Sequence, residues 1–361
     1  MIMFISYVDF DDRRSGSSVR PQKMYNAFLK LGSKVFLVTG AQNNRKKRRK
    51  TVLAALEQLK TLKPKFCYIE LPSGPIFNMA DRLLILRLHR MGVPIAAFYR
   101  DAFYKFAAWW QVSPHKKAVI NLLHKIDNRL LARCCSMVYF PSQSMADLFS
   151  FPQKGVLPPA GEARFLPVRK QARTCIYVGG LSKRYGTDIL LKAFEQLNRT
   201  GSFPLIIICR EAEKKEIAAR YLSMPWLTVA HAAEAQLKQY YTRADIGLYC
   251  GRRDVYMDFA IPVKVFEYLS YGLPVVTTNC TEIAAFVRRS DVGVIVEDNA
   301  AAIADGVSQL IENPQKYQKL CANAVLAINS ENLWEHRAAK VLTDLSSFVN
   351  PAAKRKTNQK E

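Results

Sequence analysis

Lys264 and Glu267 stand three residues apart in the stretch FAIPVKVFEYLSYGLPVVTTN, residues 259–279. Pro262 suits the first turn of a helix, and Gly272 suits the residue after its last turn. Residues three apart share a helix face, so the lysine would add positive charge where backbone N–H groups already favour an anion. The glutamate, one turn deeper, could accept hydrogen bonds from sugar hydroxyls. A simple ion pair on a solvated face would explain the same spacing.

A second candidate is the stretch YVGGLSKRYGTDILLKAF, in which a strand would end at Gly179 and Gly180. Lys183 and Arg184 follow in the loop, and Gly186 precedes the next helix. Glycines at such a turn let the backbone approach a phosphate closely. A glycine-rich turn carrying two exposed cations, without any ligand, explains the pattern equally well.

The N-terminal half contains two further candidate stretches. RRSGSSVRP follows the first apolar run, where Gly16 and Arg20 could face a ligand, although a serine of this stretch could merely cap the next helix. In FYRDAFYKFAAWW, Arg100 and Asp101 end a strand, at the edge where open α/β sheets place their ligands. An ion pair between these two residues is the structural alternative.

The elements that would position these residues alternate between apolar runs and helical patterns. IMFISYV, KVFLVTG and FCYIELP are typical of buried parallel strands, and helical segments separate them. This alternation is interrupted by a stretch rich in proline and charge, FPQKGVLPPAGEARFLPVRKQAR, which is interpreted as a linker. The alternation restarts at TCIYVGG. The sequence thus predicts two doubly wound α/β domains, at residues 1–165 and 166–334. A final helix at 335–350 and a disordered basic tail at 351–361 would follow.

Charge indicates an anionic partner for the first domain. The 361-residue chain is 49% hydrophobic and carries a net charge of +23, and residues 1–165 hold 27 Lys+Arg against 10 Asp+Glu. Nucleic acid, an anionic membrane and a phosphorylated substrate would all be attracted. The run RKKRRK, residues 45–50, is expected in a loop before a helix. KKAVINLLHKIDNRLLARC could be an interfacial helix at a membrane or a core-facing one.

Composition also bears on compartment and cofactors. No apolar run approaches the roughly 20 residues needed to span a bilayer, and MIMFISYVDF is too short and too soon charged for a signal peptide. The eight cysteines and five histidines show no metal-ligand spacing. These patterns favour a cytoplasmic protein that uses no metal.

Three stretches together resemble glycosyltransferases of the GT-B fold. They are PVKVFEYLSYGLPVV, YVGGLSKRYGTDILLKAF and SGSSVRPQKMYNAFLKLGSKVFLVTG. The most similar group is the retaining, nucleotide-sugar-dependent family four. This resemblance implies two Rossmann-like domains facing a cleft, with a C-terminal helix crossing back. It also implies transfer of a sugar from a nucleoside diphosphate sugar to a hydroxyl of an acceptor glycan, without a cofactor or catalytic metal.

The resemblance assigns roles to the candidate residues. The segment 230–233 would cradle the base through its backbone, and the leaving diphosphate would help to remove the acceptor's proton. The residues implied in donor binding are Gly16, Gly180, Lys183, Arg184, His231, Pro262, Val263, Lys264 and Glu267. Those implied in acceptor binding are Arg20, Arg100, Asp101, Tyr104 and Trp109. Those implied in the transfer itself are Asp101, Arg184, Lys264 and Glu267.

The sequence departs from the family pattern at three positions. Phe259 stands where many members carry the first of two glutamates, and Gly180 and Tyr185 stand where the family tends to place an arginine and a lysine. These departures leave open a non-catalytic GT-B-fold protein that binds a nucleotide sugar or glycan in support of a partner transferase. They also put the stereochemical outcome in doubt.

The predicted acceptor rests on what members of the resembled family commonly use and on the positive charge of the first domain. The basic, aromatic first domain favours an acceptor linked to polyprenyl diphosphate at the anionic inner face of the cell membrane, in bacterial surface or capsular polysaccharide assembly. Tyr104, Trp109 and their aromatic neighbours could line an acceptor groove, lie at the membrane or pack in the core. Nucleic-acid binding is disfavoured because no recognition module is visible.

Overall fold

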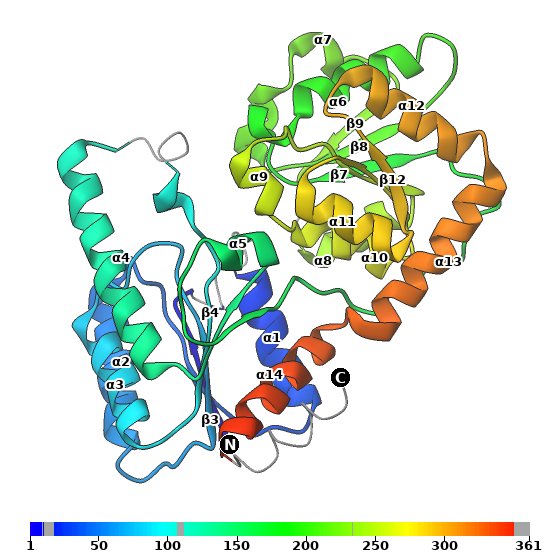
Figure 1. The fold of residues 1–361 in the computed structure, drawn as a ribbon. Helices are drawn as coiled ribbons and strands as arrows, with labels where there is room; N and C mark the ends of the chain where they lie inside the picture. Colours follow the sequence, from blue (N-terminus) through cyan, green and yellow to red (C-terminus); the bar gives the residue numbers. More distant parts are fainter. Residues whose placement is uncertain (9, 11–17, 107–111, 233, 350–361) are drawn as a thin grey trace. The chain divides into compact units, whose positions relative to one another are not determined.

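A computed structural model of the chain describes residues 1–8, 10, 18–106, 112–232 and 234–349. The chain divides into two compact units, Met1–Pro158 together with Trp334–Glu361, and Pro159–Leu333. Each unit is a parallel sheet covered by helices (Figure 1). Among the helices of the described ranges, none combines the length and the apolar character needed to cross a bilayer. The expected basic tail, Gly16 and Trp109 lie outside the described residues.

The first unit has a six-stranded parallel sheet with the order β2-β1-β3-β4-β5-β6. Three of its strands are buried along their whole length, as continuous apolar runs require. The strands are β1 Ile2–Ser6, β2 Val35–Val38, β3 Phe66–Glu70, β4 Ile95–Phe98, β5 Met137–Phe140 and β6 Lys154–Val156.

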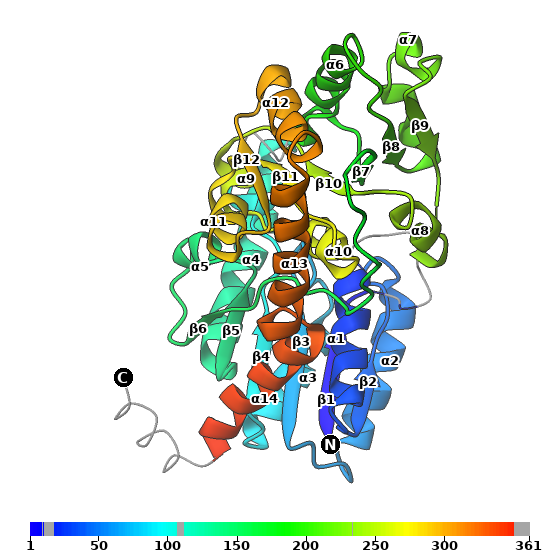
Figure 2. The same ribbon diagram turned by 90° about the vertical axis from the view of Figure 1, so that its right-hand side faces the viewer.

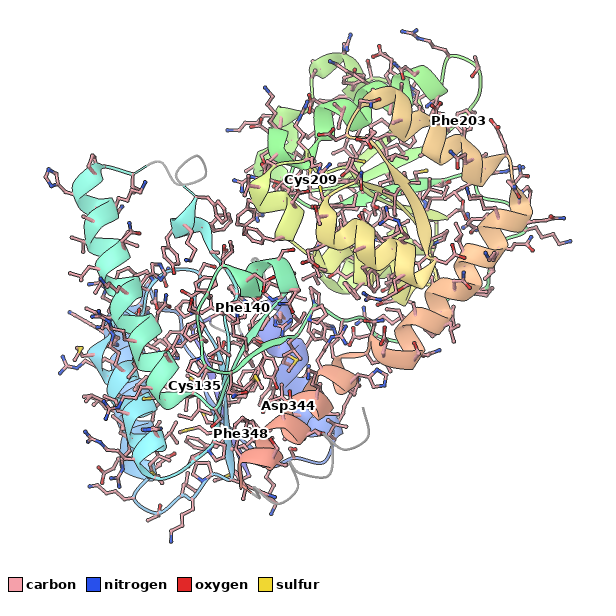
Figure 3. The ribbon with its side chains drawn as sticks, in the orientation of Figure 1. Cys135, Phe140, Phe203, Cys209, Asp344 and Phe348 are labelled. Atoms are coloured by element: carbon pink, nitrogen blue, oxygen red, sulfur yellow. The ribbon has the colours of Figure 1, made fainter. Side chains whose placement is uncertain are left out.

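In the described part of this unit, the helices that accompany the sheet are α1 Val19–Lys30, α2 Arg45–Gln58, α3 Met79–Arg90, η1 Phe103–Lys105, α4 Pro114–Cys134, α5 Gln143–Asp147 and α14 Trp334–Val349. The last helix packs beside α1 although it follows the second unit in sequence (Figure 2). The Tyr139 hydroxyl donates to Asp344 Oδ2 at 2.6 Å, which ties α14 to β5 (Figure 3). The first unit therefore needs both ends of the chain to complete its core.

The basic run RKKRRK is helical, so the loop expected there is wrong. Helix α2 begins at Arg45, and the Asn44 side chain accepts a hydrogen bond from the Lys47 backbone N–H as its cap. Arg48 is only 1% exposed and donates to Asp81 Oδ1 of α3 through Nε at 3.0 Å and Nη2 at 2.6 Å. A buried ion pair with a distant residue overrides the solvated character of the run.

The proposed linker is also partly ordered. Its residues 154–156 form β6, which pairs in parallel with β5 as the edge strand of the first sheet. Three residues give too short a pattern to be told from a loop in the sequence. Lys154 Nζ donates to the carbonyl oxygens of Ala146 and Phe149, both at 2.9 Å.

The second unit repeats the architecture with a parallel sheet of order β12-β11-β10-β7-β8-β9. Its strands are β7 Cys175–Val178, β8 Leu205–Ile208, β9 Leu227–Ala230, β10 Ile246–Tyr249, β11 Val275–Thr278 and β12 Gly293–Val296. A buried core of alternate strand residues and helix side chains covers one face of this sheet, and Phe203 and Cys209 lie beyond opposite ends of β8 (Figure 3).

The helices of the second unit are η3 Lys183–Tyr185, α6 Thr187–Leu197, η4 Glu211–Glu216, α7 Ala219–Leu222, α8 Glu234–Tyr241, α9 Val255–Phe259, α10 Val263–Ser270, α11 Thr281–Ser290, α12 Ala300–Ile311 and α13 Pro314–Glu331. The chain leaves β7 toward β8 on one side and leaves β10 toward β11 on the other. This reversal between neighbouring strands is the switch point at which open α/β sheets bind ligands, beyond the strands' carboxyl ends.

Candidate functional site

The turn after β7 brings backbone and a cation together at this switch point. Gly179 has φ +144°, and a Cβ there would lie 2.6 Å from Lys264 Nζ of α10. Gly186, which precedes α6, has φ +67°, and a Cβ there would collide with the carbonyl oxygen of Cys250 after β10. Side chains rarely adopt either of these φ values, and at Gly186 the Cys250 carbonyl also leaves no room for one.

Lys264 lies in the first turn of α10, where Pro262 keeps extended backbone angles as the N-cap. Its Nζ is buried and has no hydrogen-bond partner within the part of the chain that the structure describes. Three rings surround it, with centroids 4.2 Å away for Tyr177, 5.3 Å for Tyr185 and 5.7 Å for Tyr249. We call these three residues the tyrosine cage.

Burial has an electrostatic consequence for this lysine. Desolvation lowers the pKa of Lys264 from 10.5 to about 8, although Cys250 and Glu267 act in the opposite direction. The ammonium therefore does not form the solvated surface ion pair that the spacing allowed. This ammonium group is shielded from water and contacts only aromatic rings, so binding an anion would stabilise it.

Glu267 is half-buried one turn further along α10. The Tyr241 hydroxyl of α8 donates to its Oε2 at 3.4 Å, and the Tyr241 ring stacks on Tyr271 with centroids 4.4 Å apart. Burial, reinforced by the Glu267 charge, raises the pKa of Tyr241 far above its usual value, so the hydroxyl remains a donor at all physiological pH. The carboxylate is thus oriented by a protonated tyrosine.

The loop cations are less enclosed than Lys264. Lys183 is exposed, and Arg184 is half-buried with its guanidinium 5.6 Å from the Tyr185 ring centroid. A Cβ at Gly180 would lie 2.9 Å from the Tyr185 ring. Tyr185 is thus the η3 residue that approaches Lys264, and Arg184 lies near the same ring.

His231 follows β9, and its Nδ1 lies 3.0 Å from the carbonyl oxygen of Cys209, which follows β8. Because β8 separates β9 from β7 in the sheet, His231 belongs to a neighbouring part of the same edge rather than to the tyrosine cage. Val263 lies beside Lys264 in the first turn of α10.

The acceptor candidates of the first unit gather at the carboxyl ends of β3 and β4. Arg20 is buried, donates from Nε to Glu70 Oε1 at 3.1 Å, and lies with its guanidinium 3.4 Å from the Phe98 ring centroid. Burial lowers the pKa of Arg100, with Glu70 opposing that effect. Asp101 Oδ1 accepts from the backbone N–H of Phe103 at 3.2 Å, a turn that begins η1. Within the described ranges, no group of three or more His, Cys, Asp or Glu residues has the arrangement to hold a metal ion.

Residues 172–313, most of the second unit, match the family model described as Glycosyl transferases group 1. This part of the chain is a glycosyltransferase domain. No curated protein matches the chain in a sequence search. The structure of a glycosyltransferase from Rickettsia africae ESF-5 is similar to this chain, with a TM-score of 0.68 at 12% identity. The match covers 97% of this chain and 98% of that one.

Two further solved structures share the fold of this glycosyltransferase. Anabaena Alr3699/HepE in complex with UDP has a TM-score of 0.66 at 14% identity, covering 96% of this chain and 99% of its own. WaaG, a glycosyltransferase involved in lipopolysaccharide biosynthesis, has a TM-score of 0.64 at 13% identity, covering 94% and 98%. The sequence-based prediction of a GT-B glycosyltransferase is confirmed for both fold and enzyme class.

Four residues that contact the candidate side chains within their own units escaped the sequence reasoning. Tyr177 lies within β7 and Tyr249 ends β10, so both have the pattern of strand residues, whereas Tyr241 ends α8 and Glu70 ends β3. Only Glu70 carried a detectable signal, since a carboxylate at the end of an apolar run is costly to bury without a partner.

Proposed function

We propose that the glycosyltransferase moves a sugar from a nucleoside diphosphate sugar to a hydroxyl of an acceptor glycan, with retention of configuration. The observation that carries this proposal is the buried Lys264 ammonium, which has no hydrogen-bond partner among the described residues and lies at the start of α10. A diphosphate would supply the missing acceptors, and the helix N-terminus adds backbone donors. HepE, which shares the fold, has been solved in complex with UDP and glucose.

Lys264 would replace the loop cations found in the wider family. The Tyr185 ring fills the space beside Gly180, so an arginine side chain at Gly180 would not fit against it. In this chain the charge comes instead from α10, and the tyrosine cage keeps the ammonium dehydrated until the donor binds. Arg184 and the exposed Lys183 would contact the outer phosphate oxygens.

Glu267 would accept hydrogen bonds from the donor ribose, with Tyr241 holding its carboxylate in place. Backbone groups near His231 would contact the base. Gly16, which lies outside the described residues, remains a proposed phosphate contact. Phe259 is buried, packs on Tyr256 with ring centroids 4.7 Å apart, and has no side-chain atom that could accept a hydrogen bond from a sugar hydroxyl. Donor sugar recognition would therefore depend on other groups.

The transfer breaks the bond between the anomeric carbon and the diphosphate oxygen. The acceptor hydroxyl oxygen forms the new bond to that carbon, and its proton passes to the departing diphosphate, whose charge Lys264 and Arg184 would stabilise. Asp101 would position the acceptor hydroxyl, with Arg20 and Arg100 beside it. Because the diphosphate takes up the proton, this step needs no protein side chain as a general base. Product analysis by NMR would give the anomeric configuration, and an inverted product would refute the retaining mechanism.

We further propose a lipid-linked acceptor in bacterial surface polysaccharide assembly, with the glycosyltransferase peripherally bound to the cytoplasmic membrane face. The support lies on α4, where Val119, Leu122 and Ile126 are 57%, 58% and 40% exposed at helical spacing. Exposed cations flank this stripe, as in helices that lie at anionic interfaces. Leu122→Gln should weaken sedimentation with phosphatidylglycerol vesicles, while Leu326→Gln, a 65% exposed leucine of α13, should not.

A thermal-shift panel of UDP, GDP, dTDP, ADP and their sugars tests the donor assignment. A ligand at 100 times its dissociation constant stabilises a protein by roughly 2.7 kcal/mol. We expect one nucleotide to shift the wild type and to shift Glu267→Ala far less. Glu312→Ala, which alters an exposed glutamate just after α12, should respond as the wild type does. Release of free sugar or transfer product from the same donor completes the test. Absence of any nucleotide response would overturn the proposal.

A further inference from the structure

The first unit contains a pocket that the donor site does not use. A cavity of about 430 Å³ opens between η1, α4 and the segment that follows α5. This volume falls within the range of roughly 300–1,000 Å³ typical of small-molecule sites. Its described lining includes Lys105, Lys125 and Arg129, and none of the described lining residues is acidic.

The floor of this pocket is aromatic and its polar atoms are satisfied. The Tyr104 ring stacks on His124, with centroids 3.7 Å apart and planes 10° from parallel. Asn128 Nδ2 donates to the Tyr104 hydroxyl at 3.2 Å, and the Tyr99 hydroxyl donates to Asn128 Oδ1 at 3.1 Å. Burial lowers the pKa of His124 to about 4, so this ring is neutral at physiological pH. The floor is therefore a fixed, uncharged platform.

The three cations lie on the walls. Lys125 and Arg129 are one turn apart on α4 and share a face with Asn128. Lys105 Nζ lies 4.5 Å from the Phe149 ring centroid, and partial burial lowers the pKa of this amine. Across the described ranges, these three side chains have no ion-pair partner. Converging positive charges repel one another, and a bound polyanion relieves that repulsion.

We propose that this pocket binds the phosphoryl group of the acceptor substrate, as a phosphate or diphosphate ester. This inference rests on the proposed transfer to an acceptor, and it assigns the acceptor's anionic group to Lys105, Lys125 and Arg129. Each cation donates charge-assisted hydrogen bonds to phosphate oxygens, while the Tyr104 platform contacts the apolar face of the attached sugar or isoprenoid. A sugar phosphate and an isoprenoid diphosphate share this chemistry.

Isothermal titration calorimetry on the full chain tests the proposal. Excess UDP is present throughout, so that phosphates do not report binding at Lys264. The probes are glucose 6-phosphate, geranyl diphosphate and unphosphorylated glucose. We expect a phosphorylated probe to bind the wild type and to bind Lys125→Gln/Arg129→Gln at least tenfold more weakly. Lys116→Gln removes an exposed cation of the same helix outside the pocket and should change the affinity less than twofold.

The outcomes separate the two proposals and the two ligand sources. Binding of geranyl diphosphate alone supports a lipid-linked acceptor, and binding of glucose 6-phosphate alone supports a soluble one. Failure of both phosphorylated probes, equal binding of glucose, or wild-type affinity in the double variant would each overturn the pocket assignment. Pocket binding that persists in a protein with no nucleotide response would instead count against the proposed donor chemistry alone.

Discussion

Replacing Lys264 by methionine should stabilise the ligand-free protein while it removes nucleotide binding. Methionine keeps an unbranched apolar stem of similar length in the tyrosine cage and removes the buried charge. The drop in the lysine pKa from 10.5 to about 8 corresponds to about 3 kcal/mol of folding free energy at neutral pH. The variant also loses the cation–π attraction to the tyrosine cage, which reduces the gain in folding free energy by about 0.5–2 kcal/mol. The net gain expected for Lys264→Met is therefore about 1–3 kcal/mol at pH 7.

The free energy of unfolding should also depend on pH in a direction set by the lowered pKa of Lys264. Between pH 8 and 10.5 the unfolded chain keeps the lysine proton that the folded protein has already released. Wild-type stability should therefore rise with pH in this window relative to the variant, and the advantage of Lys264→Met should shrink toward pH 10.5. Below pH 8 both states of the wild type are protonated, and the full difference is expected.

Chemical denaturation at pH 7, 9 and 10 measures the stability, and thermal shift with UDP and the other nucleotides measures binding. Lys192→Met, which alters an exposed lysine of α6, is the matched control and should stay within about 0.5 kcal/mol of the wild type. A Lys264→Met protein less stable than the wild type, or one that keeps its nucleotide response, would refute the assignment of this lysine as a desolvated phosphate ligand.

Three further substitutions test the surrounding fold. Gly186→Ala should cost about 3 kcal/mol or more in chemical denaturation, because its φ is positive and a Cβ would meet the Cys250 carbonyl; a wild-type midpoint would contradict this. Asp81→Ala should cost about 3–5 kcal/mol by leaving Arg48 buried and unpaired, and replacing both by apolar residues should cost less than that single change. The wild type should lose up to about 3 kcal/mol between pH 6.5 and 4, where the unfolded chain protonates His124 before the folded protein does; His124→Phe should reduce this loss, and an identical acid profile would contradict it.

The repeating strands and the glycine turns were predictable because their signals are local. Continuous apolar runs identified β1, β3 and β7, and the glycines near residues 179–186 marked the turn that faces the switch point. The proline and glycine around α10 likewise placed Lys264 in a first helical turn. A strand or a capped helix depends on neighbours within a few residues, so the chain's own order contains the information.

The environment of each charged side chain was decided by contacts between distant segments. Spacing alone left Lys264 as either a ligand or a surface ion pair, and residues from β7, η3 and β10 enclose it. Arg48 looked like part of a solvated basic run, yet Asp81 draws it into the interior. The return of α14 onto α1 and the pairing of Arg20 with Glu70 also join residues far apart in sequence. Such placements follow from the topology of the two sheets and from the cost of burying an unpaired charge, neither of which a local pattern expresses.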